Sequence, residues 1–272
     1  CEEWLASTLT SRIVLRYFLD PSRLRVGLLP QVLRHPECPE DAVITLTEVA
    51  DEKIVPTLLE NLDLLKTSAL LALKDNPTYL HWQKNPPPEG LVVEVDILEM
   101  LISEMETDTG ISEERCAEML AEIDTAAPEE EKKKVTGLVQ KIAQMKVAQR
   151  VKLALLGTRE ERSLLIRDSS RVVIRAVLAS PKLTDSEAES FAAMKNVSQE
   201  VLRLISMSRK FMKRYVVVKN LVMNPRAPLD VTLPLLNRLI IQDLRAASSS
   251  KDIPDTLRKM AVKLVKTRSE NH

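Results

Sequence analysis

The sequence predicts an all-α fold in which antiparallel helix pairs stack in two parts. The chain has 272 residues but contains 5 glycines and is 3% aromatic. So few glycines disfavour sandwiches and doubly wound folds, which use glycine in tight turns. Leu is the most frequent residue and Glu, Ala, Arg and Lys are abundant, and these residues lose little side-chain freedom in a helix. The third observation is that amphipathic segments end at X-Pro steps.

Residues 1–82 are expected to form N-terminal helical repeats. Pro21 suits the first turn of a helix, where its missing N–H is not needed. The residue before a proline is pushed out of the α region, so His35-Pro36 and Asn76-Pro77 mark helix ends. The expected helices are Glu2–Leu19, Pro21–His35, a segment containing Val43, Leu46 and Val49, a segment starting at Val55, and Leu65–Asp75.

Residues 83–134 are expected to form a Pro-rich linker and an acidic helical segment. Gln83–Gly90 contains three consecutive prolines and a glycine, a composition typical of linkers. Two acidic helices are expected next, Val92–Glu106 and Ser112–Asp124. Ser112 is a suitable N-cap for the second one, because a serine hydroxyl accepts a free N–H of the first turn.

Residues 135–272 are expected to form basic C-terminal helical repeats. A long helix over Lys132–Leu156 is expected to stop at Gly157 in a left-handed conformation. Thr184 and Glu187 have the spacing of a capping box, and Ser198 suits an N-cap. The remaining helices are expected at Glu160–Ile166, Ser169–Ala179, Phe211–Met223, Leu229–Ala247 and Pro254–Lys266.

Four X-Pro breaks, at Pro36, Pro77, Pro181 and Pro225, share one pattern. The residues four, seven and eight positions before each proline are apolar, so they lie on one helical face. The residue directly before each proline is polar. The breaks lie 41 residues apart in the first pair and 44 in the second, a period typical of two-helix repeats. The apolar residues are Leu28, Leu29 and Val32; Ala69, Leu70 and Leu73; Val173, Ile174 and Val177; and Val217, Val218 and Leu221.

The turns HPECP, DNP, SPKLT and NPRAP, with the helices before them, resemble those of bacterial α-solenoids of the HEAT-repeat and leucine-rich-repeat-variant class. The resemblance covers about residues 1–80 and 150–268, and it includes the stretch GTREERSLLIRD. It implies a HEAT-like α-solenoid whose surface binds a partner protein, so we expect a non-catalytic scaffold. It implies no particular ligand. An ordinary helical bundle with X-Pro junctions remains the alternative.

The net charge of zero conceals two oppositely charged halves. Residues 1–134 contain 13 Lys and Arg and 27 Asp and Glu, a net −14, whereas residues 135–272 contain 26 and 12, a net +14. Segregated charge of this size favours electrostatic partners. A protein partner is expected, and self-association between opposite halves of two chains is a second possibility.

The basic half contains two groups of candidate binding residues. The first is Arg159, Arg162, Arg167, Arg171 and Arg175; the second is Arg209, Lys210, Lys213 and Arg214. Arg167, Arg171 and Arg175 are four residues apart, so one helical face is expected to carry them, and arginine forks suit oxyanions. Sequence-nonspecific nucleic-acid binding is therefore the alternative function, although aromatic residues for base stacking are few. The favoured alternative for the first group is a solvated face paired with Glu160, Glu161 and Asp168, because rows of charge normally solvate a helix.

No residues suggest catalysis or a bound cofactor. The chain has three histidines, and we find no phosphate-binding glycine loop or nucleophile elbow. His35 and Cys38 have a metal-like spacing but lack a second ligand pair. We therefore expect no enzyme activity, no metal and no cofactor. Three dispersed cysteines and the lack of a 20-residue apolar run favour a cytoplasmic protein without a membrane span. The chain begins at Cys1 without a methionine, so its natural start and a removed leader stay open.

Overall fold

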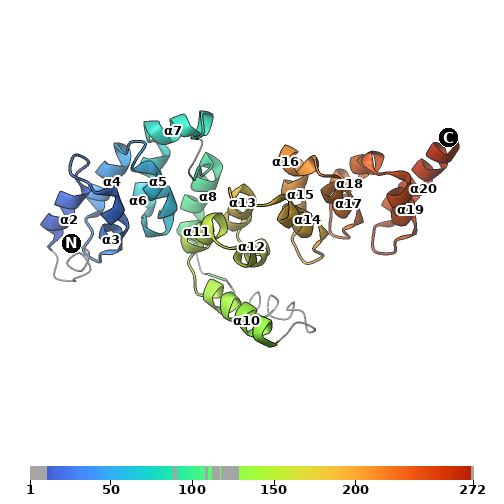
Figure 1. Ribbon diagram of the computed structural model, residues 1–272, viewed down its shortest axis with the longest axis horizontal. Helices are drawn as coiled ribbons and strands as arrows, with labels where there is room; N and C mark the ends of the chain where they lie inside the picture. The colour runs from blue at the N-terminus through green and yellow to red at the C-terminus, as the bar shows by residue number, and fades with distance from the viewer. Residues whose placement is uncertain (1–10, 88–90, 108–109, 112–116, 118–128, 271–272) are drawn as a thin grey trace. The chain divides into compact units, whose positions relative to one another are not determined.

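The protein is all-α in the part of the chain that the structure describes. The computed structural model describes residues 11–87, 91–107, 110, 111, 117 and 129–270 (Figure 1). These residues contain 18 α-helices, three short 3-10 helices and no strand. None of the described helices is long and apolar enough to cross a bilayer. The chain divides into two compact units, Cys1–Gly157 with Ser169–Pro181, and Thr158–Asp168 with Lys182–His272.

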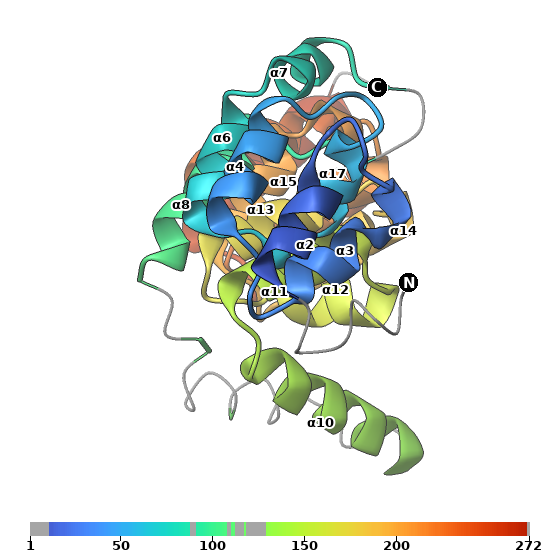
Figure 2. The ribbon, with the colours of Figure 1, turned by 90° about the vertical axis from the view of Figure 1, so that its left-hand side faces the viewer.

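The first unit is built of successive helix layers. Helix α4 packs on α2, α6 on α4, and α8 on α6, and α4, α6 and α8 line one side of the unit in Figure 2. Helix α8 then packs against both α11 and α13. The elements are α2 (Arg12–Leu19), η1 (Val26–Leu28), α3 (Leu29–Arg34), α4 (Glu40–Glu48), α5 (Val55–Glu60), η2 (Leu62–Leu64), α6 (Thr67–Lys74), α7 (Pro77–Lys84), α8 (Val95–Met105), α10 (Glu129–Ala143), α11 (Val147–Leu156) and α13 (Arg171–Ala179).

The second unit has a similar succession of packed helices. Helix α14 packs on α17, and α17 packs on α18 and α19. Helix α20 closes the end of the unit against α18 and α19. The elements are α12 (Arg159–Leu165), α14 (Asp185–Ala193), α15 (Gln199–Met207), α16 (Arg209–Met212), α17 (Tyr215–Met223), α18 (Leu229–Leu235), η3 (Leu236–Arg238), α19 (Ile241–Ser249) and α20 (Asp255–Glu270).

The four X-Pro breaks have the local structure that the sequence predicts. Each residue before the proline leaves its helix in an extended conformation, with φ between −81° and −56° and ψ between 122° and 133°. The aligned apolar residues four, seven and eight positions before each proline are buried, except Leu28, which is half-buried. The shared pattern therefore corresponds to a core-facing helix that ends before the proline. A short turn follows Pro36, Pro181 and Pro225, whereas α7 begins at Pro77 itself.

The polar residue before the proline also has a role that the sequence does not reveal. Asn76 is buried, and its Nδ2 lies 2.9–3.1 Å from the three carbonyl oxygens at the end of α4, those of Thr47, Glu48 and Ala50. The last carbonyls of a helix lack partners within the helix. Asn76, which follows α6, therefore closes the end of the neighbouring helix.

Ser180 and Asn224 repeat this contact in other layers. Asn224 Nδ2 donates to the carbonyl oxygens of Ala192 and Met194 at the end of α14, at 2.9 and 2.8 Å. Ser180 Oγ donates to the carbonyl oxygen of Leu155 in α11 at 2.8 Å. We call Asn76, Ser180 and Asn224 the pre-proline clamps, because each joins one layer to the next.

Several predicted helices are wrong in extent because extended cap residues such as Lys146 and Arg214 interrupt them. The expected helix Lys132–Leu156 divides at residues 144–146 into α10 and α11, and Phe211–Met223 divides into α16 and α17. Leu229–Ala247 comprises α18, η3 and α19, with Pro234 inside α18. Pro21 does not start a helix, since α3 begins at Leu29 with Pro30 in its first turn. The predicted helix Ser112–Asp124 and the start of Glu2–Leu19 lie outside the described residues.

Gly157 is not in the predicted left-handed conformation. Its φ is −67° and its ψ is −175°, which is extended backbone. The next residue, Thr158, caps α12, and its capping box with Glu161 explains why the chain extends there instead of turning. The predicted capping box of Thr184 and Glu187 and the predicted cap at Ser198 are both confirmed.

Two features position the middle of the chain. Glu104 of α8 accepts the Ser170 hydroxyl and, at 3.4 Å, the Val172 N–H, so it covers the start of α13 although 66 residues separate it from Ser170. Helix α7 was not predicted, and it buries Trp82 and Tyr79. The Tyr79 hydroxyl donates to the Val93 carbonyl at 2.7 Å, which fixes the chain beyond the proline-rich stretch.

The boundaries expected from composition differ from the compact units. The proline and charge content divides the chain after residues 82 and 134, whereas packing divides it after Gly157, Asp168 and Pro181. Because α8 packs against α11 and α13, helices from all three predicted segments share the first unit. The division into residues 1–82, 83–134 and 135–272 rests on composition and remains a prediction.

Candidate functional site

The turn formed by α16 presents the second group of predicted basic residues. Ser208 and Arg214 are extended on either side of this four-residue helix. Phe211 is buried and anchors the turn. Arg209, Lys210, Lys213 and Arg214 are all exposed. In Figure 1, α16 lies at the upper edge of the second unit.

Most of the charge on this turn is not neutralised by nearby carboxylates. Arg214 pairs with Glu189 and Asp185, at 3.3 and 3.7 Å. The Lys210 ammonium lies 5.6 Å from the centre of the Phe211 ring. Within the described residues, no carboxylate lies within ion-pair distance of Arg209, Lys210 or Lys213.

Other cations of the same unit are paired with carboxylates of a neighbouring layer. Arg203 contacts Asp230 at 2.7 and 3.3 Å. Further pairs join Lys195 to Asp252 and Lys219 to Asp243. The second unit contains 20 Lys and Arg against 12 Asp and Glu, a net +8. The second unit therefore has an excess of positive charge. Carboxylates neutralise part of it elsewhere in the unit, and the α16 turn carries part of what remains.

Exposed apolar side chains lie next to this charge. Met207, the last residue of α15, is 73% exposed, and Ile240 is 51% exposed. The Tyr215 hydroxyl accepts the Ile240 N–H at 3.1 Å and donates to Asp243. Arg238 donates to the Met212 carbonyl at 2.6 Å, which brings another cation to the turn. We call Met207, Arg209, Lys210, Lys213, Arg214, Tyr215, Val216, Arg238 and Ile240 the basic–apolar patch.

The first group of predicted residues does not form one basic row. Arg162 is buried, and its guanidinium binds Glu187 with both Nε and Nη2, at 2.8–3.1 Å. Arg162 Nη2 also donates to the Lys182 carbonyl at 3.3 Å. This arginine therefore joins α12 to α14 instead of facing a partner. Glu187 was not among the carboxylates expected to pair with this group, Glu160, Glu161 and Asp168.

The remaining arginines of that group belong to different elements. Helix α13 begins at Arg171, so Arg167 lies in the preceding turn and not on the same helical face. Arg167 Nε donates to the Ser163 carbonyl at 3.2 Å. Arg175 lies 3.8 Å from Asp96 of α8. Arg159 and Arg171 are exposed. The expected face of three arginines is therefore wrong, because a helix cap interrupts it at Ser170.

Burial of Glu187 and its ion pair have a further electrostatic consequence. Burial by itself raises the pKa of Glu187, but the Thr184 N–H and hydroxyl and the Arg162 guanidinium together hold it below its ordinary value. The Glu187 carboxylate therefore remains charged inside the protein, and it serves the cap of α14 as well as the ion pair.

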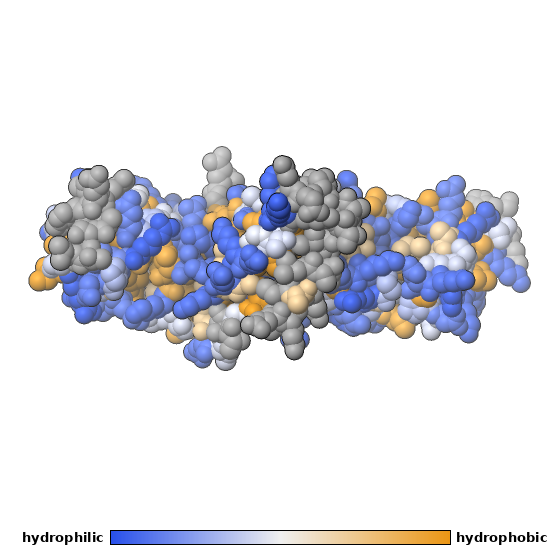
Figure 3. All heavy atoms as spheres, turned by 90° about the horizontal axis from the view of Figure 1, so that it is seen from below, coloured by the Kyte–Doolittle hydropathy of each residue, from blue (hydrophilic) through white to orange (hydrophobic). Residues whose placement is uncertain are grey.

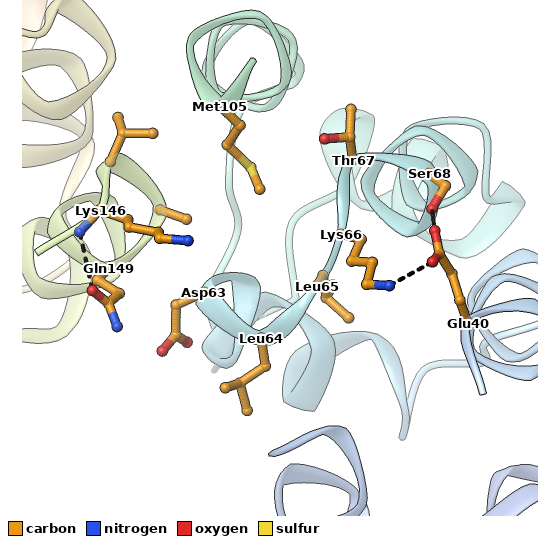
Figure 4. Close-up of a pocket in the computed structure, with 12 residues that line it drawn as sticks. Glu40, Asp63, Leu64, Leu65, Lys66, Thr67, Ser68, Met105, Lys146 and Gln149 are labelled. Carbon is orange, nitrogen blue, oxygen red and sulfur yellow. Dashed lines mark hydrogen bonds and ion pairs between the residues drawn. The ribbon is translucent and has the colours of Figure 1, made fainter. Parts of the chain in front are cut away.

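The first unit contains a pocket of about 650 Å³. It opens between η2, the first residues of α6 and α11, and the end of α8, and Met105 and Lys146 point into it (Figure 4). Lys66 turns instead to Glu40, at 2.6 Å, and Ser68 donates to the same carboxylate at 2.6 Å. These two contacts hold the pKa of Glu40 below its ordinary value. Asp63 is held by Lys152 at 2.7 Å.

This pocket therefore has mixed charges that largely satisfy one another. One hydroxyl–carboxylate contact lies in its lining, that of Ser68 with Glu40, and the same carboxylate also binds the Lys66 ammonium. No group of three or more His, Cys, Asp and Glu side chains among the described residues is arranged to hold a metal. His35, half of the metal-like spacing, is buried and accepts the Glu37 N–H at 3.1 Å. On the face seen in Figure 3 the described surface is mainly hydrophilic, with hydrophobic side chains in small groups.

The comparisons with known proteins identify no relative. No family model matches the chain, and neither a curated protein nor a solved structure shows significant similarity to it. The function must therefore be inferred from the chain itself.

The sequence indicated the basic run of α16 but not the rest of the patch. Arg238 and Ile240 are about 25 residues from it in the sequence and reach it by packing. The sequence signal for the apolar part of the patch was that Met207 and Tyr215 flank the basic run. An apolar residue beside a cluster of cations is unremarkable until its exposure is known.

Proposed function

We propose that this protein is a non-catalytic scaffold that binds a partner protein through the surface of a HEAT-like α-solenoid. The succession of packed helices supports the solenoid, and so do the pre-proline clamps, which repeat one contact in three layers. Stacked helix pairs provide long surfaces without a catalytic cleft.

The observation that carries the proposal is the basic–apolar patch. It combines exposed cations with exposed apolar side chains, and three of the cations, Arg209, Lys210 and Lys213, have no carboxylate at ion-pair distance within the described residues. Dispersed cysteines make a reducing cytoplasm part of the same proposal.

An affinity capture with the intact chain tests the scaffold. The bait is immobilised, a nuclease-treated lysate of the organism that encodes it is applied, and bound proteins are quantified against a bait-free matrix. A protein retained in near-stoichiometric amount at physiological salt is expected. Capture of no protein above background would contradict the scaffold role.

Sequence-nonspecific nucleic-acid binding is the second candidate, since the second unit carries a net +8. Phe191 and Phe211 are buried, which removes them as stacking platforms. A gel-shift titration at two salt concentrations tests this candidate: binding that weakens steeply with salt supports it, and no binding at low salt removes it.

Self-association is a further part of the proposal. The first unit carries 19 Lys and Arg against 27 Asp and Glu, a net −8, opposite to the second unit. Attraction between exposed charges weakens when salt screens them. Light scattering should therefore show a mass above that of one chain at low salt that falls at high salt; a constant monomer mass would contradict self-association.

A further inference from the structure

The cations of the basic–apolar patch are arranged to receive negative charge. Arg209, Lys210 and Lys213 lie within five residues on an exposed turn, and Arg238 reaches the same turn through the Met212 carbonyl. A planar guanidinium can bind a carboxylate with two parallel hydrogen bonds, whereas an ammonium acts as a point charge. Phe211 fixes the turn in the core, so these cations are displayed from a rigid base.

The apolar members of the patch provide anchors beside that charge. Met207 is 73% exposed, and Val216 is 44% exposed. Methionine adapts its shape to different partner side chains. Tyr215 is held in place by hydrogen bonds to Ile240 and Asp243. The residues that dominate interface energies are aromatic residues, Met and Arg, and all three kinds are present here.

We propose that the basic–apolar patch binds an acidic peptide segment of a partner protein, one that carries apolar side chains between its carboxylates. The inference rests on the proposed scaffold function and names the site and the chemistry of the partner. The partner's carboxylates bind Arg209, Lys210 and Lys213, and its apolar side chains cover Met207 and Ile240.

The carboxylates that border the patch favour a short segment over a nucleic acid or a membrane. Asp185 and Glu189 lie beside Arg214, and Asp243 lies between Tyr215 and Lys219. They would repel an extended phosphate backbone or an anionic lipid surface that spread beyond the α16 turn. A peptide can place its charges on the turn and leave these carboxylates in water.

A selection from a random peptide library displayed on phage tests this inference on the intact chain. Peptides that bind the unmodified protein are recovered, synthesised and titrated by fluorescence anisotropy. We expect recovered peptides to be rich in Asp and Glu interspersed with Leu, Phe or Trp. Recovery of no peptides, or of peptides without acidic residues, would overturn the inference.

A charge-reversal variant locates the site. Arg209→Glu/Lys210→Glu/Lys213→Glu should weaken binding of the recovered peptides about 10-fold or more, a loss of about 1.4 kcal/mol or more. The matched control is Arg226→Glu/Lys251→Glu/Lys263→Glu, which makes the same change in net charge at exposed positions of the same unit. Equal weakening by both variants would reduce the effect to net charge and overturn the assignment.

A second variant tests the apolar anchors, and circular dichroism checks that each variant is folded. Met207→Ser/Ile240→Ser should weaken peptide binding at unchanged charge, whereas unchanged affinity would overturn the anchor role. Duplex DNA and phosphatidylserine vesicles are titrated in parallel. If either binds more tightly than the peptides and is lost in the same charge reversal, the partner class is wrong.

Failure of this inference can be distinguished from failure of the scaffold role. If the lysate capture retains a protein and the α16 charge reversal does not release it, the scaffold stands and the site lies elsewhere. If the capture retains no protein, the scaffold role itself fails.

Discussion

Replacing a pre-proline clamp should destabilise the protein in proportion to the number of carbonyl oxygens that the clamp serves. Three carbonyl oxygens share the two N–H groups of the Asn76 amide, two carbonyl oxygens accept from the Asn224 amide, and one accepts from the Ser180 hydroxyl. The three side chains are all buried, so water cannot easily replace the lost donors.

The magnitude follows from these counts. A hydrogen bond contributes about 1 kcal/mol net, and a buried acceptor left without a donor costs about 1–3 kcal/mol. We therefore expect Ser180→Ala to cost about 1 kcal/mol, Asn224→Ala about 2 kcal/mol and Asn76→Ala about 3 kcal/mol of the free energy of unfolding. Asn76 has the additional loss of its cap on the Tyr79 N–H, at 2.9 Å.

Asn224→Asp separates the hydrogen bonds from packing. The substitution preserves the volume of the side chain but removes both amide donors and turns a carboxylate toward two carbonyl oxygens. If the lost donors matter most, Asn224→Asp is at least as destabilising at pH 7 as Asn224→Ala. If the cavity matters most, alanine is the more damaging substitution.

Urea unfolding followed by far-ultraviolet circular dichroism measures these changes. Hydrogen exchange resolved by peptide assigns each loss to its unit, because the two units need not unfold together. Asn237→Ala, at an exposed position, is the control and should stay within about 0.5 kcal/mol of the unmodified protein. Equal costs for Ser180→Ala and Asn76→Ala would refute the reasoning.

Three further outcomes are expected in the second unit. Arg162→Met should lower the free energy of unfolding by about 3–5 kcal/mol, because it leaves the Glu187 carboxylate buried without its partner. In a double-mutant cycle measured by urea unfolding, the double variant with Glu187→Met should lose less than the sum of the two single losses. Simple additivity would contradict a coupled pair. The folded pKa of Glu187 is depressed, so its contribution is present above the unfolded value of about 4.3 and is lost as pH falls through the folded value. Urea midpoints between pH 7 and pH 3 should therefore fall less in Glu187→Gln than in the unmodified protein, and parallel curves would disprove this contribution. Thr158→Ala should cost about 0.5–2 kcal/mol by removing the cap of α12; hydrogen exchange should then quicken in α12, and unchanged exchange there would show that the cap is dispensable.

The helix ends and the buried faces were predictable because they depend on neighbouring residues. The proline at 225 forces Asn224 into an extended conformation whatever lies around it. The spacing of Val217, Val218 and Leu221 places them on one face of any helix. The capping box of Thr184 and Glu187 is equally local.

The candidate site was less predictable because pairing between layers decides which cations remain exposed. Arg162 and Arg209 were both candidate binding residues. Arg162, however, binds Glu187 in the next layer and is buried, whereas Arg209 is exposed. Arg162 and Glu187 are 25 positions apart, and nothing in the sequence between them indicates their contact. The helix cap at Ser170 likewise separated Arg167 from Arg171 and Arg175, whose spacing suggested a common face.

The sequence by itself therefore determined the all-α class, the four proline breaks and the burial of the aligned apolar residues before them, except Leu28. These features follow from backbone sterics and helical periodicity, which act over a few residues. Only the tertiary structure decided that Asn76, Ser180 and Asn224 close the ends of neighbouring helices, that Arg162 is an internal ion pair, and that the α16 turn displays its charge. Those outcomes depend on distances between layers, which a pattern along one chain does not contain.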